Sequence, residues 1–311
     1  MKKVAVAIAT VSLVVGFSSL TMAASDIKGT LNNDATVKES ANVAIGKGAT
    51  ANMGSMAVKN SNVSGKVNNK ANIEKSANVA IGENVTANMG AVTLQDANVK
   101  GSITNNATVK ESANVAIGKN TTANMASVTM KGGSVDGKVT NTANIEKSAN
   151  VAIGENTTAN MGSVTMQDGN VKGSITNNAK IKESANVAIG KDTVANMGSV
   201  TMRGGSVKGS VNNKATIEKS ANVAIGEGTT ANMGSVTMDN ATVDGKVNNN
   251  ATVKESANVA IGKNTTANMG SVTIKNANVK GTINNTAKID KSANVAIGEN
   301  STASMGSTTV E

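Results

Sequence analysis

The chain of 311 residues contains no Cys, Pro, His, Trp or Tyr, and its one aromatic side chain is Phe17. Without His or Cys, the common nucleophile–base pairs and zinc ligand sets cannot be assembled. Without aromatic rings, there is no platform on which single-stranded nucleic acid could stack. We therefore expect a protein that is not an enzyme, with no catalytic residues, no cofactor and no bound metal ion.

Charge is also scarce, because only 16% of the residues are charged whereas 39% are hydrophobic. This balance is too apolar and too weakly charged for an ordinary disordered chain. The folded core must be built from Val, Ile, Ala and Met, and no disulfide can support it.

Residues 1–23 have the pattern of a secretory signal peptide. Lys2 and Lys3 supply the positive start, an apolar run covers positions 4–15, and residues 21–23 (Thr-Met-Ala) offer small side chains beside a cleavage point. Polar residues interrupt the apolar stretch, which disfavours a membrane anchor of about 20 apolar residues. We expect a bacterial protein, secreted to the extracellular space or cell surface, with no membrane insertion. Loss of the two Lys lowers its net charge from +9 to +7.

The rest of the chain is an internal repeat. The hexapeptide Ala-Asn-Val-Ala-Ile-Gly recurs eight times at a constant spacing of 36 residues, without insertion or deletion. If cleavage follows Ala23, residues 24–311 divide into eight units of 36 with nothing left for caps or a second domain. The Val of the hexapeptide marks each unit, at Val43, Val79, Val115, Val151, Val187, Val223, Val259 and Val295.

Each unit is rich in Thr, Val, Asn and Gly, and its apolar residues alternate over short runs, which is typical of strands. Gly29 and Gly46 recur in all eight units and mark bends. A strand-and-bend unit of constant length is the signature of a β-solenoid. We predict an all-β fold, a β-solenoid of eight stacked 36-residue layers without caps. The columns at Val43, Ile45 and Met53 are expected to fill its interior.

Three charged positions alternate in sign from each unit to the next. Opposite charges on neighbouring strands stabilise and like charges destabilise, so this alternation indicates that residues i and i+36 lie side by side. In the competing arrangement, with coils of about 18 residues, these residues would be roughly 9.6 Å apart. The columns are Lys38, Glu74, Lys110, Glu146, Lys182, Glu218, Lys254, Asp290; Glu39, Lys75, Glu111, Lys147, Glu183, Lys219, Glu255, Lys291; and Lys47, Glu83, Lys119, Glu155, Lys191, Glu227, Lys263, Glu299.

Two positions are Asn in every unit, one column running from Asn33 to Asn285 and the other from Asn42 to Asn294. Stacked amides can hydrogen-bond along the layer axis, as in cross-β assemblies. Asn also tolerates the left-handed backbone of bends. Both interpretations remain open for both columns.

The segment 114–124, Asn-Val-Ala-Ile-Gly-Lys-Asn-Thr-Thr-Ala-Asn, resembles the repeat of Fap-type functional amyloid subunits. In those repeats Asn-Val-Ala-x-Gly is followed, after several polar residues, by Ala-Asn. The chain departs from that family in having eight contiguous repeats, only two Gln residues and no Cys pair near the C-terminus. The resemblance implies an exported, biofilm-associated fibre protein whose repeats stack as β layers.

Residues 115–118 (Val-Ala-Ile-Gly) are also similar to the head repeats of trimeric autotransporter adhesins. Those units are shorter, and the resemblance ranks second because neither a stalk nor a membrane-anchoring end precedes Glu311. It supports the alternative function, a surface adhesin whose solenoid face binds a ligand.

Other binding functions have weaker support. Repeated calcium cages are excluded because the equivalents of Asp136 and Asp244 are often Lys, and a Thr column that could suit ice is interrupted by Val194. Arg203 is the only Arg, and Lys occupies the equivalent positions 59, 131 and 275, so we interpret it as a substitute for Lys. The positive net charge makes anionic matrix polysaccharide and extracellular DNA candidate partners through salt-sensitive contacts.

The two ends of the solenoid are predicted to be complementary, because the number of layers is even. Layer 1 (24–59) carries Lys38, Glu39, Lys47 and Lys59, and layer 8 (276–311) carries Asp290, Lys291, Glu299 and Glu311 at the matching positions. Stacking layer 8 of one molecule on layer 1 of another would continue every ladder. A head-to-tail contact of this kind does not close on itself and generates open filaments. We therefore expect a homopolymer.

Overall fold

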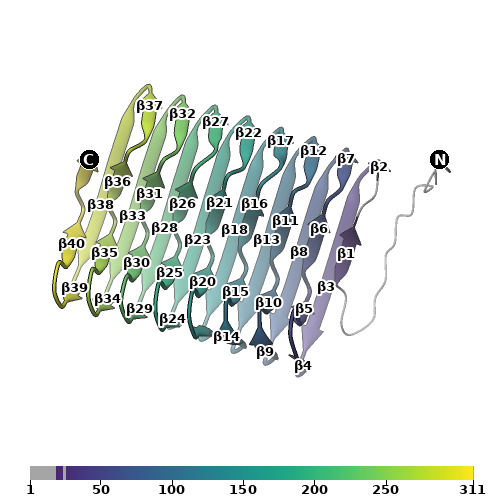
Figure 1. Cartoon of the computed structure of the whole chain (residues 1–311), viewed down its shortest axis with the longest axis horizontal. Helices are drawn as coiled ribbons and strands as arrows, with labels where there is room; N and C mark the ends of the chain where they lie inside the picture. The colour runs from purple at the N-terminus through teal and green to yellow at the C-terminus, as the bar shows by residue number, and fades with distance from the viewer. Residues whose placement is uncertain (1–18, 24–25, 311) are drawn as a thin grey trace.

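The computed structural model describes residues 19–23 and 26–310, and every regular element in these ranges is a β-strand. The strands form successive coils that stack along one axis, with the N-terminal and C-terminal layers at opposite ends (Figure 1). The prediction of an all-β solenoid of about eight 36-residue turns is confirmed. Most of the predicted signal peptide, including Phe17, lies outside the described residues.

Each layer contributes one strand to each of five parallel sheets, which we name A to E. Along the chain the strands of one layer follow the order B, C, D, E, A. Sheet A comprises β1 (Leu20–Ala23), β6 (Met56–Lys59), β11 (Val92–Gln95), β16 (Val128–Lys131), β21 (Val164–Gln167), β26 (Val200–Arg203), β31 (Val236–Asp239), β36 (Val272–Lys275) and β41 (Thr308–Val310). Sheet B comprises β2 (Asp26–Lys28), β7 (Asn62–Ser64), β12 (Asn98–Lys100), β17 (Ser134–Asp136), β22 (Asn170–Lys172), β27 (Ser206–Lys208), β32 (Thr242–Asp244) and β37 (Asn278–Lys280).

The other three sheets have eight strands each. Sheet C, with the longest strands, comprises β3 (Leu31–Lys38), β8 (Val67–Glu74), β13 (Ile103–Lys110), β18 (Val139–Glu146), β23 (Ile175–Lys182), β28 (Val211–Glu218), β33 (Val247–Lys254) and β38 (Ile283–Asp290). Sheet D comprises β4 (Ala41–Ile45), β9 (Ala77–Glu83), β14 (Ala113–Lys119), β19 (Ala149–Ile153), β24 (Ala185–Ile189), β29 (Ala221–Ile225), β34 (Ala257–Ile261) and β39 (Ala293–Ile297). Sheet E comprises β5 (Thr50–Met53), β10 (Thr86–Met89), β15 (Thr122–Met125), β20 (Thr158–Met161), β25 (Val194–Met197), β30 (Thr230–Met233), β35 (Thr266–Met269) and β40 (Thr302–Met305).

The register of these sheets is constant, because each residue pairs with the one 36 positions further along. Val115 lies between Val79 and Val151, and Lys119 lies opposite Glu83. Neighbouring strands in a sheet are about 4.8 Å apart, so every side chain has its counterpart of the next layer beside it. The 36-residue coil deduced from the charge alternation is correct, and the 18-residue coil is wrong.

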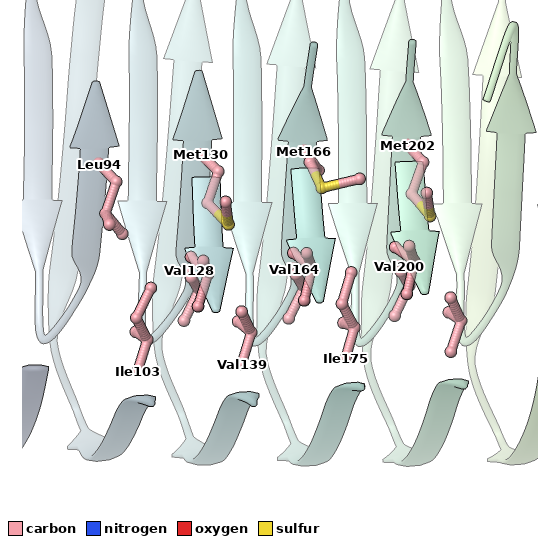
Figure 2. Close-up of a cluster of buried hydrophobic side chains, with 14 of the residues drawn as sticks. Leu94, Ile103, Val128, Met130, Val139, Val164, Met166, Ile175, Val200 and Met202 are labelled. Carbon is pink, nitrogen blue, oxygen red and sulfur yellow. The ribbon is translucent and has the colours of Figure 1, made fainter. Parts of the chain in front are cut away.

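The largest core cluster lies between sheets A, B and C. It contains the Val, Leu, Ile and Met residues that point inward from these sheets, such as Met130, Val135 and Ile103. Figure 2 shows these side chains repeating along the stack, with Met130, Met166 and Met202 in one column. All three are at most 1% exposed. A column of this kind is filled by identical or similar side chains, so each layer packs as the previous one does.

Two narrower clusters complete the interior. Sheet C packs on sheet E through residues such as Ile73 and Met89, which confirms that the Met53 column is buried. Between sheets D and E the core consists almost entirely of Ala, such as Ala80 and Ala87. This part of the cross-section is too thin for larger side chains.

The prediction that the Val43 and Ile45 columns are buried is wrong. In β4, Val43 is 57% and Ile45 is 74% exposed, and the equivalent residues of the inner layers are exposed or half-buried. Asn42 and Ala44 alternate with them and point inward instead. The narrow core between the strands of sheets D and E is lined by Asn and Ala, and the larger Val and Ile side chains lie on the opposite face of sheet D.

Candidate functional site

The Asn33 column forms a continuous amide ladder inside the solenoid. The Nδ2 of each Asn donates to the Oδ1 of its counterpart in the following layer, from Asn33 through to Asn285, at 2.7–3.0 Å. The inner members are at most 2% exposed. A buried amide without partners would be costly, so the stacked arrangement makes this buried polar column possible.

The Asn42 column forms a second ladder, from Asn42 to Asn294, with Nδ2–Oδ1 distances of 2.8–2.9 Å. Its Nδ2 groups also donate to backbone carbonyls of sheet E, as Asn150 does to Ala123 and Asn160 at 3.1 Å. These bonds attach sheet D to sheet E where the core is thinnest.

A third amide ladder was missed by the sequence analysis. It runs in sheet E from Asn52 to Asn268, with Nδ2–Oδ1 distances of 2.9–3.0 Å. Its donors point to the preceding layer, opposite to the other two ladders. The recurrence of Asn at this position in seven units was the available signal, and Ser304 occupies it in the last layer.

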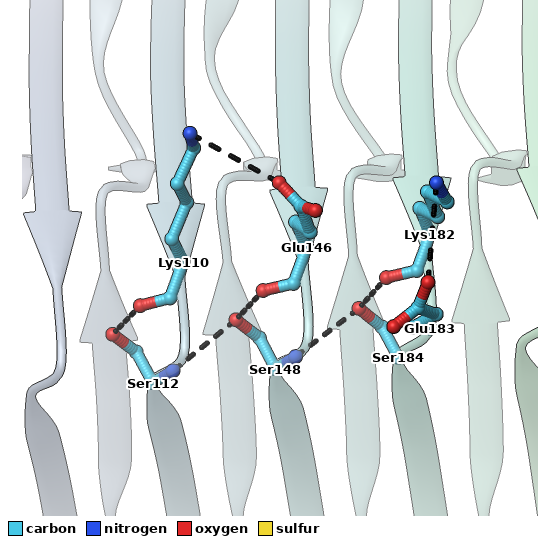
Figure 3. A network of polar contacts seen from close by, with 7 residues as sticks. All are labelled: Lys110, Ser112, Glu146, Ser148, Lys182, Glu183 and Ser184. Atoms are coloured by element: carbon cyan, nitrogen blue, oxygen red, sulfur yellow. Dashed lines mark hydrogen bonds and ion pairs between the residues drawn. The ribbon is translucent and has the colours of Figure 1, made fainter.

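A ladder of Ser residues lies at the bend between sheets C and D and was also missed. The backbone N–H of Ser112 donates to the Oγ of Ser148 at 3.3 Å, and the Ser148 N–H donates to Ser184 at 3.2 Å. Each of these hydroxyls donates to the carbonyl two residues earlier, as Ser112 does to Lys110 at 2.6 Å (Figure 3). The bend therefore has its own polar bonding along the axis.

The charge columns lie on the solvated surface. In the Lys47 column, Lys119 and Glu155 are 3.2 Å apart and Lys263 and Glu299 are 3.0 Å apart. Side chains of these pairs remain 49–75% exposed, and such pairs contribute only about 0–1 kcal/mol each. Lys47 pairs with Glu83 at 3.6 Å.

The Lys38 column behaves similarly, with an ion pair between Lys38 and Glu74 at 3.7 Å and one between Lys110 and Glu146 at 4.0 Å (Figure 3). In both columns the ion pairs join a Lys to the Glu of the following layer. Asp290 lies opposite Lys254 in β38, at the end of the column.

The Glu39 column differs from the other two. Each of its eight members, from Glu39 to Lys291, has a left-handed backbone with φ between 46° and 50°. Among the described residues none of them forms an ion pair along the axis, and only Glu183 has one, with Lys182 at 3.9 Å. Lys59, the remaining charged end position of layer 1, lies opposite Gln95, whereas its predicted partner Glu311 lies outside the described residues.

The described layers end in open sheet edges. Inward residues of β38 are half-buried where those of β33 are buried, and Met305 is 46% exposed where Met269 is fully buried. At the other end, β2, β3, β4 and β5 are the terminal strands of sheets B to E, and only sheet A continues, through β1.

The described part of the chain shows no group of three or more acidic, His or Cys side chains that could hold a metal ion. It also has no helix of the length and hydrophobicity that crossing a bilayer requires. Asp136 lies between Lys100 and Lys172 in sheet B.

In comparisons with known proteins, no family model, no curated protein and no solved structure matches this chain.

Proposed function

We propose that the protein is a secreted structural subunit that polymerises head to tail into an extracellular, amyloid-like fibre with a matrix role in biofilms. The observation that carries this proposal is that sheets B to E and the Asn33 and Asn42 ladders run in register through the described layers and end at the terminal strands. An exposed strand edge is a template for pairing with another chain.

The two edges fit each other at the polar positions. Asn33 directs its Nδ2 to Asn69 and leaves its Oδ1 facing the end of the stack. Asn285, in the last layer, receives the bond from Asn249 on its Oδ1 and donates to the Ser307 carbonyl. Because an amide nitrogen has two hydrogens, Asn285 retains one for Asn33 of the next molecule. Asn294 already donates to the Ala267 and Ser304 carbonyls at 3.0 and 2.9 Å. Inner members of this column, such as Asn150, make two such bonds and also donate to the next Asn, so Asn294 would share its Nδ2 hydrogens with Asn42 in that way.

Charge favours the same junction. Asp290 and Glu299 would approach Lys38 and Lys47, and Lys291 would approach Glu39. In the Lys38 and Lys47 columns, no described Glu forms an ion pair within 4.0 Å with the Lys of the following layer; the ion pairs run only from a Lys to the following Glu. The opposite charges at the junction would therefore attract each other without forming close ion pairs. They would specify the register of the junction more than its affinity.

Sheet A indicates how a strand can dock at the N-terminal edge. Residues 20–23 pair with β6 in parallel, with Leu20 opposite Met56. In a head-to-tail junction β41 of another molecule would take this place, since its Thr308–Val310 is equivalent to Met56–Val58 in the layer register. Cleavage after Ala23 would remove β1 and open the edge.

A surface adhesin is the second candidate. Sheets E and A meet in a crease on the outer surface, whose lining includes Thr122, Thr158, Asn156, Lys131 and Arg203. Hydroxyl, amide and cationic groups in one crease suit an anionic polysaccharide. Fibre formation and such binding are compatible.

Electron microscopy of the mature protein, beginning at residue 24, tests the proposal. We expect filaments with a cross-β reflection near 4.8 Å, and slower filament growth by the full chain, in which β1 occupies the docking edge. Discrete particles of monomer size at all concentrations would contradict the fibre function and favour the adhesin.

A further inference from the structure

The outer face of sheet D is an apolar surface that no other described segment of the chain covers. Ala77, Val79 and Ile81 and their equivalents point outward from successive strands. Of the nine exposed large hydrophobic residues in the described chain, seven lie on this face: Val43, Ile45, Ile81, Ile117, Ile225, Ile261 and Ile297. Soluble monomers rarely expose a continuous apolar strip of this kind.

Charged columns border the strip on both sides. Glu83 continues the outward alternation of Val79 and Ile81 in β9, so the Lys47 column lies along one border. Along the other border a shallow groove is lined by the Ala41, Ser40 and Glu39 columns over the length of the stack.

We propose that this face packs against the same face of a second copy, so that two parallel stacks form a pair. The two-fold axis is parallel to the stack and passes by the Val43 column. Position 43 then faces position 43 of the partner, and position 45 faces position 41. The protruding Ile column of one copy therefore lies over the small Ala column and groove of the other. This pairing does not require the head-to-tail contact.

The borders match in every layer. In this arrangement position 47 of each layer faces position 39 of the same layer in the other copy. Lys47 thus faces Glu39, and Glu83 faces Lys75, and the alternation makes all the other layers equally complementary. A slip of one layer would bring like charges together along both borders, so the charge pattern excludes slips by an odd number of layers.

The backbone of the Glu39 column supports a role for its charges. A left-handed conformation costs about 1–2 kcal/mol for a residue other than Gly or Asn. Another left-handed bend of the same layer avoids this cost, because its residue is Gly54. At position 39 the chain instead retains Glu or Lys in all eight layers, with no axial ion pair within the described molecule. Partners on a second copy would give these charges a function.

The size of the face agrees with a weak contact that strengthens on polymerisation. Four residue steps give a width of about 13 Å, and eight layers give a height of about 38 Å. Each copy would bury roughly 500 Å², and the pair about 1,000 Å², the lower limit of a specific interface. In a filament this area grows with the number of subunits.

A polar substitution of the face tests the pairing. Thr replaces Val at positions 79, 115, 151, 187, 223 and 259 in one full-chain variant, and Ile replaces the same six in the control. All three residue types favour strands, so both variants should fold. We expect mass per unit length, measured by scanning transmission electron microscopy, to fall twofold in the Thr variant and to remain unchanged in the Ile control. An equal mass per length in the Thr variant and the wild type would overturn the pairing.

The outcome is separable from that of the fibre proposal. Should no filament form, analytical ultracentrifugation over a concentration series applies: pairing requires a dimer for the wild type and a monomer for the Thr variant. A wild type that remains monomeric throughout would overturn it. Binding of the wild type to lipid vesicles without dimerisation would assign the face to a membrane surface and would also overturn it.

Cross-linking tests the orientation, because the chain has no native Cys. In the proposed pair the Val151→Cys side chain faces its own copy across packed sheets about 10 Å apart, which a short bis-maleimide spans. In the Ile153→Cys control, the thiols of the two copies lie on opposite sides of the two-fold axis. They are offset along the strand direction by four residue steps, which is about 13 Å. We expect covalent dimers from V151C and at least tenfold fewer from I153C. Equal yields would overturn the two-fold arrangement.

Discussion

Each inner side chain of this solenoid has its own equivalent on both sides, about 4.8 Å away along the axis. This stacking favours residues that bond to copies of themselves, such as Asn150, which lies between Asn114 and Asn186 in its column. The stacking also repeats an unfavourable residue in several layers. The hydroxyls of Thr121, Thr157, Thr193 and Thr229 are buried, and none has a hydrogen-bond partner in the described structure.

Replacing Thr157 by Val should stabilise the protein by about 1 kcal/mol, because a buried hydroxyl without a partner costs about 1–3 kcal/mol. Val is compatible with the site, since Val85 occupies the same column and is fully buried. The denaturant midpoint measures the gain. Thr158→Val is the matched control at the next, half-buried position, and we expect a change within about 0.5 kcal/mol. Destabilisation by T157V would mean that the hydroxyl has a partner.

The buried amides should have the opposite response. Asn150→Ala removes a ladder member and leaves the carbonyls of Ala123 and Asn160 without its bonds, at a cost of about 2–4 kcal/mol. Asn156→Gly is the control in the same layer. Asn156 is exposed and left-handed with φ of 52°, so Gly should be tolerated within about 0.5 kcal/mol. Equal losses in the two variants would contradict a structural role for the buried ladder.

At the scale of strands and bends, the sequence was sufficient for the layer length and for the register, because charge alternation depends directly on which residues are neighbours. It was not sufficient for the orientation of sheet D. Hydrophobicity alone favours Val79 and Ile81 as the buried residues. The hydrogen bonds from Asn78 to sheet E carbonyls and the thin Ala core decide otherwise. These contacts join different strands, so the sequence of one strand alone does not predict which of its faces is buried.

The Gly46 column, at the C-terminal end of the sheet D strands, should be the least tolerant of substitution. Gly118 has φ of 139°, and a Cβ there would collide with the carbonyl oxygen of Gly82 in the preceding layer. Gly118→Ala should therefore cost at least about 1–3 kcal/mol, seen as a lower denaturant midpoint. In the control, Gly48→Asn, the site has open space and its counterpart Asn84 is Asn. A midpoint shift in G118A no larger than that in G48N would contradict the close approach of the layers.

At the scale of the whole molecule, the repeat gives each end layer the same kind of surface that inner layers use to contact each other. The C-terminal layer exposes groups that are buried in every inner layer, as Met305 and Met269 illustrate. Stacking another molecule on this layer would bury them with contacts that the solenoid already uses seven times. Head-to-tail growth therefore requires no new kind of interface. The sequence predicted the complementary ends, whereas the strand β1 at the N-terminal edge emerged only from the structure.

The central claim is that subunits join in register, and the parity of the repeat number tests it most directly. Deleting one 36-residue repeat would place Lys254, Glu255 and Lys263 of one molecule against Lys38, Glu39 and Lys47 of the next, whereas deleting two restores opposite signs. The measurement is the polymerisation rate of six-, seven- and eight-repeat proteins at low salt, followed by light scattering. We predict rapid growth for six and eight repeats and slow growth for seven, with partial recovery as salt screens the junction. Equal rates for all three at low salt would contradict in-register stacking.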